Sequence, residues 1–310
     1  MGSAYPAGRE ESDGRRTTAT SCSTAGVARP PLPRPRHGSG RGVSTVCTGP
    51  PGGEYLSAVN QQLLDPVRIT VVQNSPDVTL DAFADRLGPD VRLVRPFDGD
   101  ALPDATDLGD GLVVLGGQMS AYADDVAPWL PALRDLLAAA VYSDVPTLGI
   151  CLGAQLLAVA GGGSVQVAAP PGREAGLTRV FWKAGAEGDP VLGPIARAAA
   201  GTGKRARSLT VSMHADAIID LPEGASWLGM SDMYPYQAFR HGSALGVQFH
   251  PEATLATIRG WADQHDDVDT TNILADAAPF EGEVLETGRL LAESFLAAVH
   301  DDVARRGVRA

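Results

Sequence analysis

The chain has 310 residues, of which 44% are hydrophobic and 5% aromatic, and its formal net charge is −12 at pH 7. This length and hydrophobic content suffice for one sizeable α/β core with additional segments. The negative charge argues against nucleic acid or an anionic membrane as the main partner. The sequence has no run of about 18 apolar residues, so we expect no membrane-spanning segment.

Residues 1–66 differ in composition from the rest of the chain. They are rich in Gly, Pro, Ser, Thr and Arg and show hardly any apolar periodicity. Such a segment buries too little surface to offset its ordering entropy, so we predict a disordered N-terminal tail. The pair Arg15-Arg16 is typical of a twin-arginine export signal, but no apolar segment follows it, which argues against a signal peptide. A mis-assigned translation start is the other explanation of this tail.

The three cysteines are unevenly distributed. Cys22 and Cys47 lie in the tail, and Cys151 lies in the remainder of the chain. Their spacing provides neither a disulfide framework nor a set of metal ligands, so we expect no metal and no cofactor. A reducing, cytoplasmic location fits this pattern and would keep the thiol of Cys151 available.

From residue 67 the chain alternates between strand and helix patterns. The apolar spacing predicts strands at 68–73, 91–95, 112–115 and 146–150, and helices at 78–87 and 128–141. Strands that alternate with helices imply a parallel sheet with helices on its faces, and ligands bind such sheets at the carboxyl ends of the strands.

The second half of the chain has shorter apolar runs. We expect a strand at 176–182 and several antiparallel strands between 208 and 249. Helices are predicted at 254–265 and 283–300, joined by an acidic, irregular stretch from 263 to 276. The predicted fold is therefore α/β, a mostly parallel sheet flanked by helices, with a small antiparallel subsheet and a C-terminal helical extension.

The sequence around Cys151 predicts a strand, a sharp turn and a helix. An apolar strand leads into Gly149-Ile150-Cys151-Leu152-Gly153, and a helix-forming run follows. Glycines on both sides allow close backbone approach at a strained turn, as in the nucleophile elbow of serine hydrolases. At the first turn of a helix, unpaired N–H groups favour a thiolate, which makes Cys151 a candidate nucleophile. The alternative is a buried structural cysteine.

A second segment offers a base and a group that orients it. Pro251 keeps His250 out of the helical region, and in an extended chain His250 and Glu252 point to the same side. Glu252 can then accept a hydrogen bond from one imidazole nitrogen while the other nitrogen faces Cys151. A single histidine at a strand end is more often structural, but the combination with the cysteine turn favours catalysis.

A third segment offers hydrogen-bond donors for an oxyanion. The strand at 112–115 ends in Gly116-Gly117, where backbone N–H groups can approach a ligand closely. We expect the backbone N–H groups of Gly117 and Leu152 to form an oxyanion hole. By itself the glycine pair would rather indicate an ordinary turn after a strand.

Together these segments resemble the class I glutamine amidotransferase (triad glutaminase) family, and in particular the stand-alone relatives of the amidotransferase domain of GMP synthase. The resemblance spans about residues 67 to 262, which implies a flavodoxin-like amidotransferase domain, with 263–310 as a C-terminal helical extension packed on it. The stretches that carry it are Gly116-Gly117, Gly149–Gln155, Gly246–Glu252, His214-Ala215-Asp216 and Gln237-Ala238-Phe239-Arg240.

The resemblance also implies roles for individual residues. Cys151, His250 and Glu252 would form the catalytic triad, and Gly117 and Leu152 the oxyanion hole. Gln155 would hold the amino-acid part of the substrate, and Gly116 and His214 would also belong to the substrate site. Gln118 departs from the proline that often follows the glycine pair in GMP synthases, so the contacts at the rim of the site are open.

The implied reaction is hydrolysis of the side-chain amide of L-glutamine through a cysteinyl thioester, which yields glutamate and ammonia. The expected partners are L-glutamine or a γ-glutamyl compound and a separate ammonia-accepting synthetase. One alternative is a γ-glutamyl peptidase or hydrolase that uses the same triad. The other is a catalytically silent regulatory subunit, whose expected signature is the loss of Cys151, His250 or Glu252; all three are present.

Overall fold

The computed structural model describes residues 66–200 and 207–309. The tail predicted for residues 1–66 therefore lies outside the described part of the chain, apart from its last residue.

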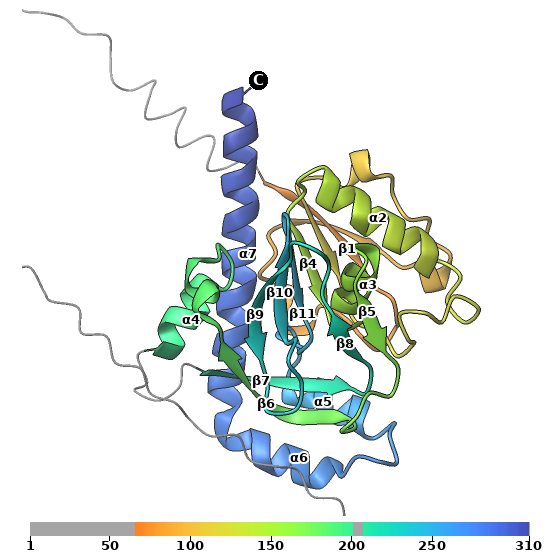
Figure 1. Cartoon of the computed structure of the whole chain (residues 1–310), viewed down its shortest axis with the longest axis vertical. Coiled ribbons are helices and arrows are strands. Elements are labelled where there is room, and N and C mark those ends of the chain that lie inside the picture. The colour runs from red at the N-terminus through yellow and green to blue at the C-terminus, as the bar shows by residue number, and fades with distance from the viewer. Residues whose placement is uncertain (1–65, 201–206, 310) are drawn as a thin grey trace, which may run out of the picture. The chain divides into compact units, whose positions relative to one another are not determined.

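The main element is a nine-stranded sheet with the strand order β2-β1-β3-β4-β11-β10-β9-β6-β7 (Figure 1). The first five strands of this order are mutually parallel, and every pair from β11 to β7 is antiparallel. The parallel strands are β1 (Arg68–Val72), β2 (Asp90–Val94), β3 (Gly111–Val114), β4 (Thr147–Ile150) and β11 (Ala244–Val247). The antiparallel part adds β6 (Glu174–Trp182), β7 (Arg207–His214), β9 (Ser226–Met230) and β10 (Ala238–His241).

A second, two-stranded antiparallel sheet pairs β5 (Ser164–Gln166) with β8 (Ala217–Asp220). The predicted α/β fold class is confirmed, because a mostly parallel sheet, flanking helices and a small antiparallel sheet are all present.

Helices cover both faces of the sheet because successive strand residues point to opposite sides. In β3, Leu112 and Val114 pack in the core cluster that contains α2 and α3, whereas Val113 packs in the cluster that contains α5 and α7. Figure 1 shows α2 and α3 on one side of the sheet and α7 on the other. The helices are α2 (Leu130–Tyr142), α3 (Leu152–Ala160), α4 (Gly193–Ala200), α5 (Leu255–Ala262), α6 (Thr270–Ala277) and α7 (Glu281–Arg309).

Two predicted segments differ from the structure. The helix predicted at 78–87 is reduced to one 3₁₀ turn, Asp81–Phe83, because Asp81 has a positive φ of 40° and its carboxylate accepts a 2.7 Å hydrogen bond from the backbone N–H of Thr254. The stretch 263–276, predicted to be irregular, contains α6, which begins where the Asp269 side chain accepts a hydrogen bond from the N–H of Asn272. Such a cap satisfies an otherwise unpaired donor of the first helical turn.

The last helix packs onto the sheet through a stripe of apolar side chains. Leu291, Phe295 and Val299 recur at intervals of four residues and are fully or almost fully buried. They join the core formed with β1, β4 and the other helices on that face. Helix α7 is therefore an integral part of the hydrophobic core.

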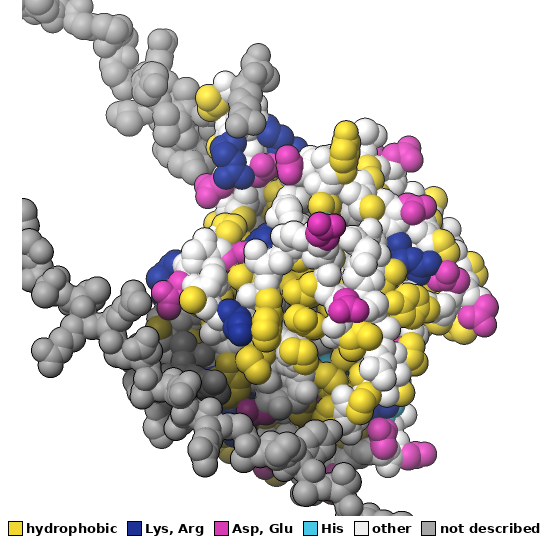
Figure 2. All heavy atoms as spheres, in the orientation of Figure 1, with side chains coloured by type: hydrophobic (Ala, Val, Ile, Leu, Met, Phe, Trp, Pro, Cys, Tyr) yellow, Lys and Arg dark blue, Asp and Glu magenta, His cyan; other side chains and the backbone are white. Residues whose placement is uncertain are grey.

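Charged side chains are dispersed over the surface. On the face in Figure 2, acidic and basic groups lie interspersed, and at the C-terminal end of α7 Asp302 pairs with both Arg305 and Arg306. Among the described residues, no helix has the length and apolar character needed to cross a membrane.

Leu291→Ala tests the contribution of α7 to the core. Because Leu291 is 0% exposed, the substitution leaves a cavity and should lower the free energy of unfolding by about 2–5 kcal/mol. Leu285→Ala in the same helix is the matched control, since Leu285 is 37% exposed and its loss should change stability far less. Urea unfolding of the three proteins measures the difference. Equal midpoints would contradict this account of α7.

Candidate active site

The candidate site lies at the carboxyl ends of three neighbouring parallel strands. In the sheet, β4 lies between β3 and β11, with Val114 beside Gly149 and Val247 beside Ile150. The chain leaves all three strands at the same edge, because parallel strands share the direction of their carboxyl ends. The glycine pair after β3, the cysteine after β4 and the His-Pro-Glu segment after β11 therefore meet there.

Cys151 lies on a strained turn, as the flanking glycines predict. Its φ of 50° and ψ of −105° are unusual for a residue with a side chain. Its N–H donates to the carbonyl of Val247 at 2.8 Å, and α3 begins at the next residue. A Cβ on Gly149 would lie 2.6 Å from the carbonyl oxygen of Gly153, and one on Gly153 would lie 2.1 Å from that of Val114. The two glycines thus allow the contacts that hold Cys151 in place.

His250 and Glu252 form a buried hydrogen bond. The imidazole Nδ1 donates to Glu252 Oε1 at 2.7 Å, and the two side chains are 3% and 0% exposed. The second carboxylate oxygen, Oε2, is buried without a partner among the described residues. Because few other groups stabilise the charge of this buried carboxylate, it favours the protonated, positively charged form of the His250 imidazole. The indole of Trp261 covers the imidazole, with ring centroids 4.5 Å apart.

The environment of His250 keeps its imidazole protonated. Burial lowers the pKa of His250, but the charges of Glu252 and Cys151 and the hydrogen bonds to both outweigh burial and raise that pKa from 6.5 to about 10. The imidazolium is thus the form present at neutral pH, placed between a carboxylate and a sulfur atom. This arrangement can give a proton to a departing group and take one from water.

The glycine pair after β3 lies against both catalytic candidates. A Cβ on Gly116 would lie 3.0 Å from His250 Cε1 and 3.5 Å from the Cβ of Cys151, so Gly116 leaves space for the imidazole beside the cysteine. A Cβ on Gly117 would lie 2.8 Å from the side chain of Leu152. The N–H of Leu152 is in the first turn of α3, where N–H groups have no intrahelical acceptor.

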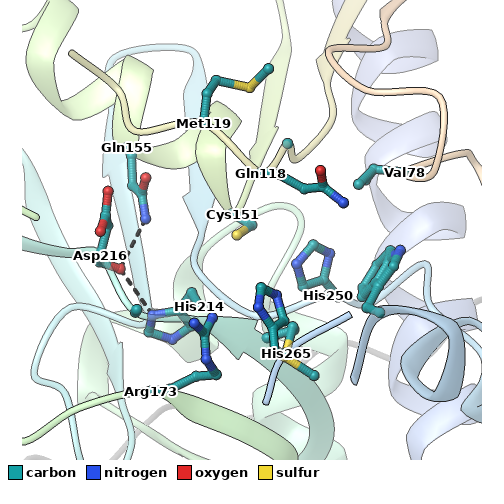
Figure 3. A pocket seen from close by; sticks show the side chains of 14 residues that line it. Val78, Gln118, Met119, Cys151, Gln155, Arg173, His214, Asp216, His250 and His265 are labelled. Atoms are coloured by element: carbon teal, nitrogen blue, oxygen red, sulfur yellow. Dashed lines mark hydrogen bonds between the residues drawn. The ribbon is translucent and has the colours of Figure 1, made fainter. Parts of the chain in front are cut away.

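Glutamine side chains surround the cysteine on the other side. Gln248 Nε2 lies 3.6 Å from the sulfur of Cys151, and Gln155 Nε2 donates to the side-chain oxygen of Gln248 and to the carbonyl of Asp216. Figure 3 shows Gln155 and Asp216 on one side of Cys151 and His250 on the other. The neighbourhood of the sulfur is therefore polar on both sides.

A second buried network supports the wall of the site. His214 Nδ1 donates to the carbonyl of Asp216 at 3.0 Å, and its Nε2 is hydrogen-bonded to Glu174 Oε2 at 3.0 Å. Gln237 donates to the same carboxylate oxygen at 2.6 Å. Since both ring nitrogens of His214 are engaged, its ring presents a fixed surface to the site.

These residues enclose a cavity of about 240 Å³. Of the residues predicted for the site, Gly117, Cys151, Gln155, His214 and His250 line it. Glu252, Leu152 and Gly116 are not among the lining residues. The remaining lining residues are Val78, Gln118, Met119, Arg173, Met213, Ala215, Asp216, Trp261 and His265.

Four of the residues that shape the site, Arg173, Trp261, His265 and Glu174, had no role in the sequence interpretation. Glu174 precedes an alanine and a glycine in a Glu-x-Gly pattern that could have pointed to it. The other three show no local motif and reach the site through the fold.

The His-Pro-Glu segment is held from two sides. The carbonyl of Glu252 accepts a 3.0 Å hydrogen bond from the N–H of Ala82, in the middle of the 3₁₀ turn. On the other side, α7 approaches so closely that a Cβ on Gly288 would lie 2.0 Å from the carbonyl oxygen of Pro251. Both contacts fix the backbone that carries His250.

Comparison with known proteins shows which family the chain belongs to. Residues 85–260 match the model of the class-I glutamine amidotransferases. The chain belongs to this family. It is 33% identical over 189 residues to a protein of Natronomonas pharaonis that is named as one subunit of a glutamine-hydrolysing GMP synthase. That match covers 60% of this chain and 88% of the relative.

Other similar proteins agree with this assignment. The glutamine-hydrolysing GMP synthase of Streptococcus equi subsp. zooepidemicus is 32% identical over 145 residues, which cover 46% of this chain and 24% of that longer protein. A solved structure of a glutamine amidotransferase from Thermotoga maritima has a TM-score of 0.62 and 26% identity, and the match covers 74% of this chain and 98% of that one. The amidotransferase resemblance and the flavodoxin-like fold are confirmed.

Replacement of Cys151 by glycine tests the backbone strain at the turn. The Cys151→Gly protein should be more stable than Cys151→Ala by about 1 kcal/mol, because glycine tolerates this positive φ whereas alanine does not. Urea unfolding of both variants measures the difference. A less stable glycine variant would show that the turn stores no steric strain.

Glu252→Gln tests the charge coupling of His250. Without that carboxylate, burial is opposed only by Cys151, so the pKa of His250 should fall well below about 10. NMR titration of the imidazole measures this pKa, and His265, whose pKa is lowered by burial and by Arg173, is the internal control.

The same substitution changes the pH dependence of stability. A folded-state pKa raised above 6.5 means that protonation of His250 stabilises the fold fully below about pH 6.5, and that this contribution is lost as pH rises toward 10. In Glu252→Gln the loss should begin at lower pH. An unchanged titration of His250 and an unchanged stability profile would contradict the coupling.

Proposed function

We propose that the chain is a glutaminase that hydrolyses the side-chain amide of L-glutamine through a thioester on Cys151. The observation that carries this proposal is the buried pair of His250 and Glu252, joined at 2.7 Å, beside a cysteine held at a φ of 50° on the edge of a cavity. A nucleophile, a base and a group that orients the base are the requirements of covalent acyl transfer.

In the first step the thiolate of Cys151 attacks the amide carbon of glutamine and forms a C–S bond. The carbonyl oxygen takes up the electron pair and becomes an oxyanion, which the N–H groups of Gly117 and Leu152 stabilise. The C–N bond then breaks, and the imidazolium of His250 gives its proton to the leaving nitrogen. Ammonia and a γ-glutamyl thioester result.

In the second step water attacks the thioester. His250, now neutral, takes a proton from the water, and Glu252 stabilises the imidazolium that forms. The C–S bond breaks, which releases glutamate and regenerates the thiolate. The balance of both steps is glutamine plus water to glutamate plus ammonia.

The remaining predicted residues support binding in this proposal. Gln155 and His214 line the side of the cavity away from His250, where the amino-acid part of the substrate extends. Gly116 contributes by leaving space for the imidazole next to Cys151.

We also propose that the ammonia serves a separate synthetase. The relative from Natronomonas pharaonis is named as one subunit of GMP synthase, which implies that a further one exists. The match covers 24% of the length of the streptococcal GMP synthase, so most of that longer protein has no counterpart in the matched part of this chain.

Ammonia release from L-glutamine by the purified protein tests the reaction. The unchanged protein should release ammonia, and Cys151→Ala should lower the rate by a factor of about 10⁴ or more, because nucleophile, base and orienting group act as a unit. His250→Ala should have a similar effect. Glu223→Ala, at an exposed position that does not line the cavity, is the control that should retain activity.

γ-Glutamyl peptides assayed in parallel separate the alternatives. Release only from these peptides would replace the glutaminase with a γ-glutamyl hydrolase. No release from either class of substrate, with Cys151 also unreactive to iodoacetamide, would overturn the proposal in favour of a catalytically silent protein.

A further inference from the structure

The buried side chain of Gln248 points at the sulfur atom of Cys151. Its Nε2 lies 3.6 Å from Sγ, a separation that suits an N–H···S hydrogen bond because sulfur is larger than oxygen. Gln248 is 1% exposed and does not line the catalytic cavity. It therefore belongs to the packing around the cysteine and not to the surface that faces a substrate.

The backbone fixes the position of Gln248 relative to the cysteine. The carbonyl of Val247 accepts the hydrogen bond from the N–H of Cys151, and the N–H of Gln248 donates to the carbonyl of Gln237 at 2.9 Å. Two residues after Gln248, His250 forms its own hydrogen bond with the sulfur. One short segment thus presents both an amide and an imidazolium to Cys151.

The orientation of the Gln248 amide follows from its neighbours. A backbone carbonyl can only accept hydrogen bonds, so the nitrogen of the Gln155 side chain, and not its oxygen, faces the carbonyl of Asp216 at 3.0 Å. The same nitrogen lies 3.3 Å from the Gln248 side chain and must meet its oxygen there. The nitrogen of Gln248 is therefore the atom that faces the sulfur.

The sulfur of Cys151 is the sole acceptor found for the Gln248 side-chain nitrogen among residues 66–200 and 207–309. A neutral thiol accepts hydrogen bonds weakly, whereas ionised acceptors such as a thiolate form stronger ones. A buried N–H group without another acceptor gains most from the stronger bond. The contact with Gln248 therefore favours the thiolate.

A thiolate at this position requires such a donor. The carboxylate of Glu252 and the imidazolium of His250 together carry no net charge, so the charge of the sulfur would be an additional buried negative charge. Burial disfavours an ionised group unless hydrogen bonds replace those of water. Gln248 supplies one of these hydrogen bonds from within the protein.

We propose that Gln248 stabilises the thiolate of Cys151 through this N–H···S hydrogen bond, and that Gln155 is the positioning residue that fixes the Gln248 amide. The inference rests on the proposed function, in which this thiolate is the nucleophile of the first step and the leaving group of the second. The sulfur of the thioester is a weak acceptor, so the contact becomes strong again as the C–S bond breaks. Gln248 thus favours both the formation and the release of the nucleophile.

Gln248→Met tests the contact, because methionine has a similar length and no donor. The rate at which iodoacetamide alkylates Cys151 is measured against pH by mass spectrometry of the peptide that contains it, which separates Cys151 from Cys22 and Cys47. The pH of half-maximal rate should rise by about one to two units, the range expected for a hydrogen bond to a charged group. An unchanged pH profile would overturn the inference.

Further variants test the orientation of the amide. Gln248→Glu keeps the size of the side chain but places a carboxylate beside the sulfur, so the profile should shift in the same direction and at least as far. Gln155→Met should shift it less, because the Gln248 amide is present but free to turn. Added to Gln248→Met, Gln155→Met should cause no further shift. An additive shift would show that Gln155 acts on the sulfur without Gln248.

Gln73 provides the matched control. This glutamine follows β1, is 4% exposed, and its side chain binds two backbone carbonyls and Arg95. Gln73→Met removes a buried amide that has no contact with Cys151, so the alkylation profile should not change. A shift as large as that of Gln248→Met would replace the proposed contact with a general effect on the fold.

NMR of the unchanged protein tests the contact without a substitution at Gln248. The ¹⁵N and ¹H signals of the Gln248 side-chain amide should titrate with the same midpoint as the alkylation rate, because the N–H···S bond strengthens when the thiol ionises. In Cys151→Ala this titration should disappear. Signals that do not respond to pH would overturn the inference even if Gln248→Met failed to fold.

Ammonia release from L-glutamine, measured on the same proteins, separates this inference from the reaction. At pH 7, Gln248→Met should lower kcat by roughly tenfold with a smaller effect on KM, because Gln248 does not line the cavity. If the unchanged protein released no ammonia but the alkylation shift appeared, the proposed reaction would fail and the role of Gln248 would stand. Ammonia release without the shift would overturn that role and keep the reaction. Absence of both would overturn both.

Discussion

The site depends on a single backbone turn. At Cys151 the chain reverses from a buried strand into α3 with a φ of 50°, and the N–H group of this residue is fixed by the carbonyl of Val247 on the neighbouring strand. The same hydrogen bond ties the cysteine to the strand that leads into His250. A strained conformation of this kind persists only where the surrounding structure determines it, and here the glycines at 149 and 153 permit the close packing that does so.

Electrostatic interactions between Glu252, His250 and Cys151 are the second feature that defines the site. Glu252 is fully buried, and one of its oxygens lacks a partner among the described residues, so its charge is compensated mainly by His250. The imidazolium in turn lies beside the sulfur. Three side chains from two strand ends thus interact with one another in a medium of low polarity, where electrostatic interactions are strong. Trp261 shields the imidazole from one side.

Local sequence patterns predicted the parts of the fold and the site that depend on neighbouring residues. The glycines that allow the turn at Cys151 lie two residues away on either side, and Glu252 lies two residues after His250. The strands that carry both residues are short apolar runs. The helix expected at 78–87 did not form, because Asp81 binds Thr254, which is distant in sequence. Helix α6 was missed because its eight residues include only two large apolar side chains, Ile273 and Leu274. The position of Arg173 follows from tertiary packing, which no local pattern records.

The contact between Gly288 and the carbonyl of Pro251 has a mechanical consequence. There is no space between the two backbones for even one additional carbon atom, so α7 and the His-Pro-Glu segment cannot shift toward each other independently. The far end of the same segment is anchored to Ala82. The segment that carries His250 is therefore held at both ends, by Ala82 near the beginning of the domain and by the last helix.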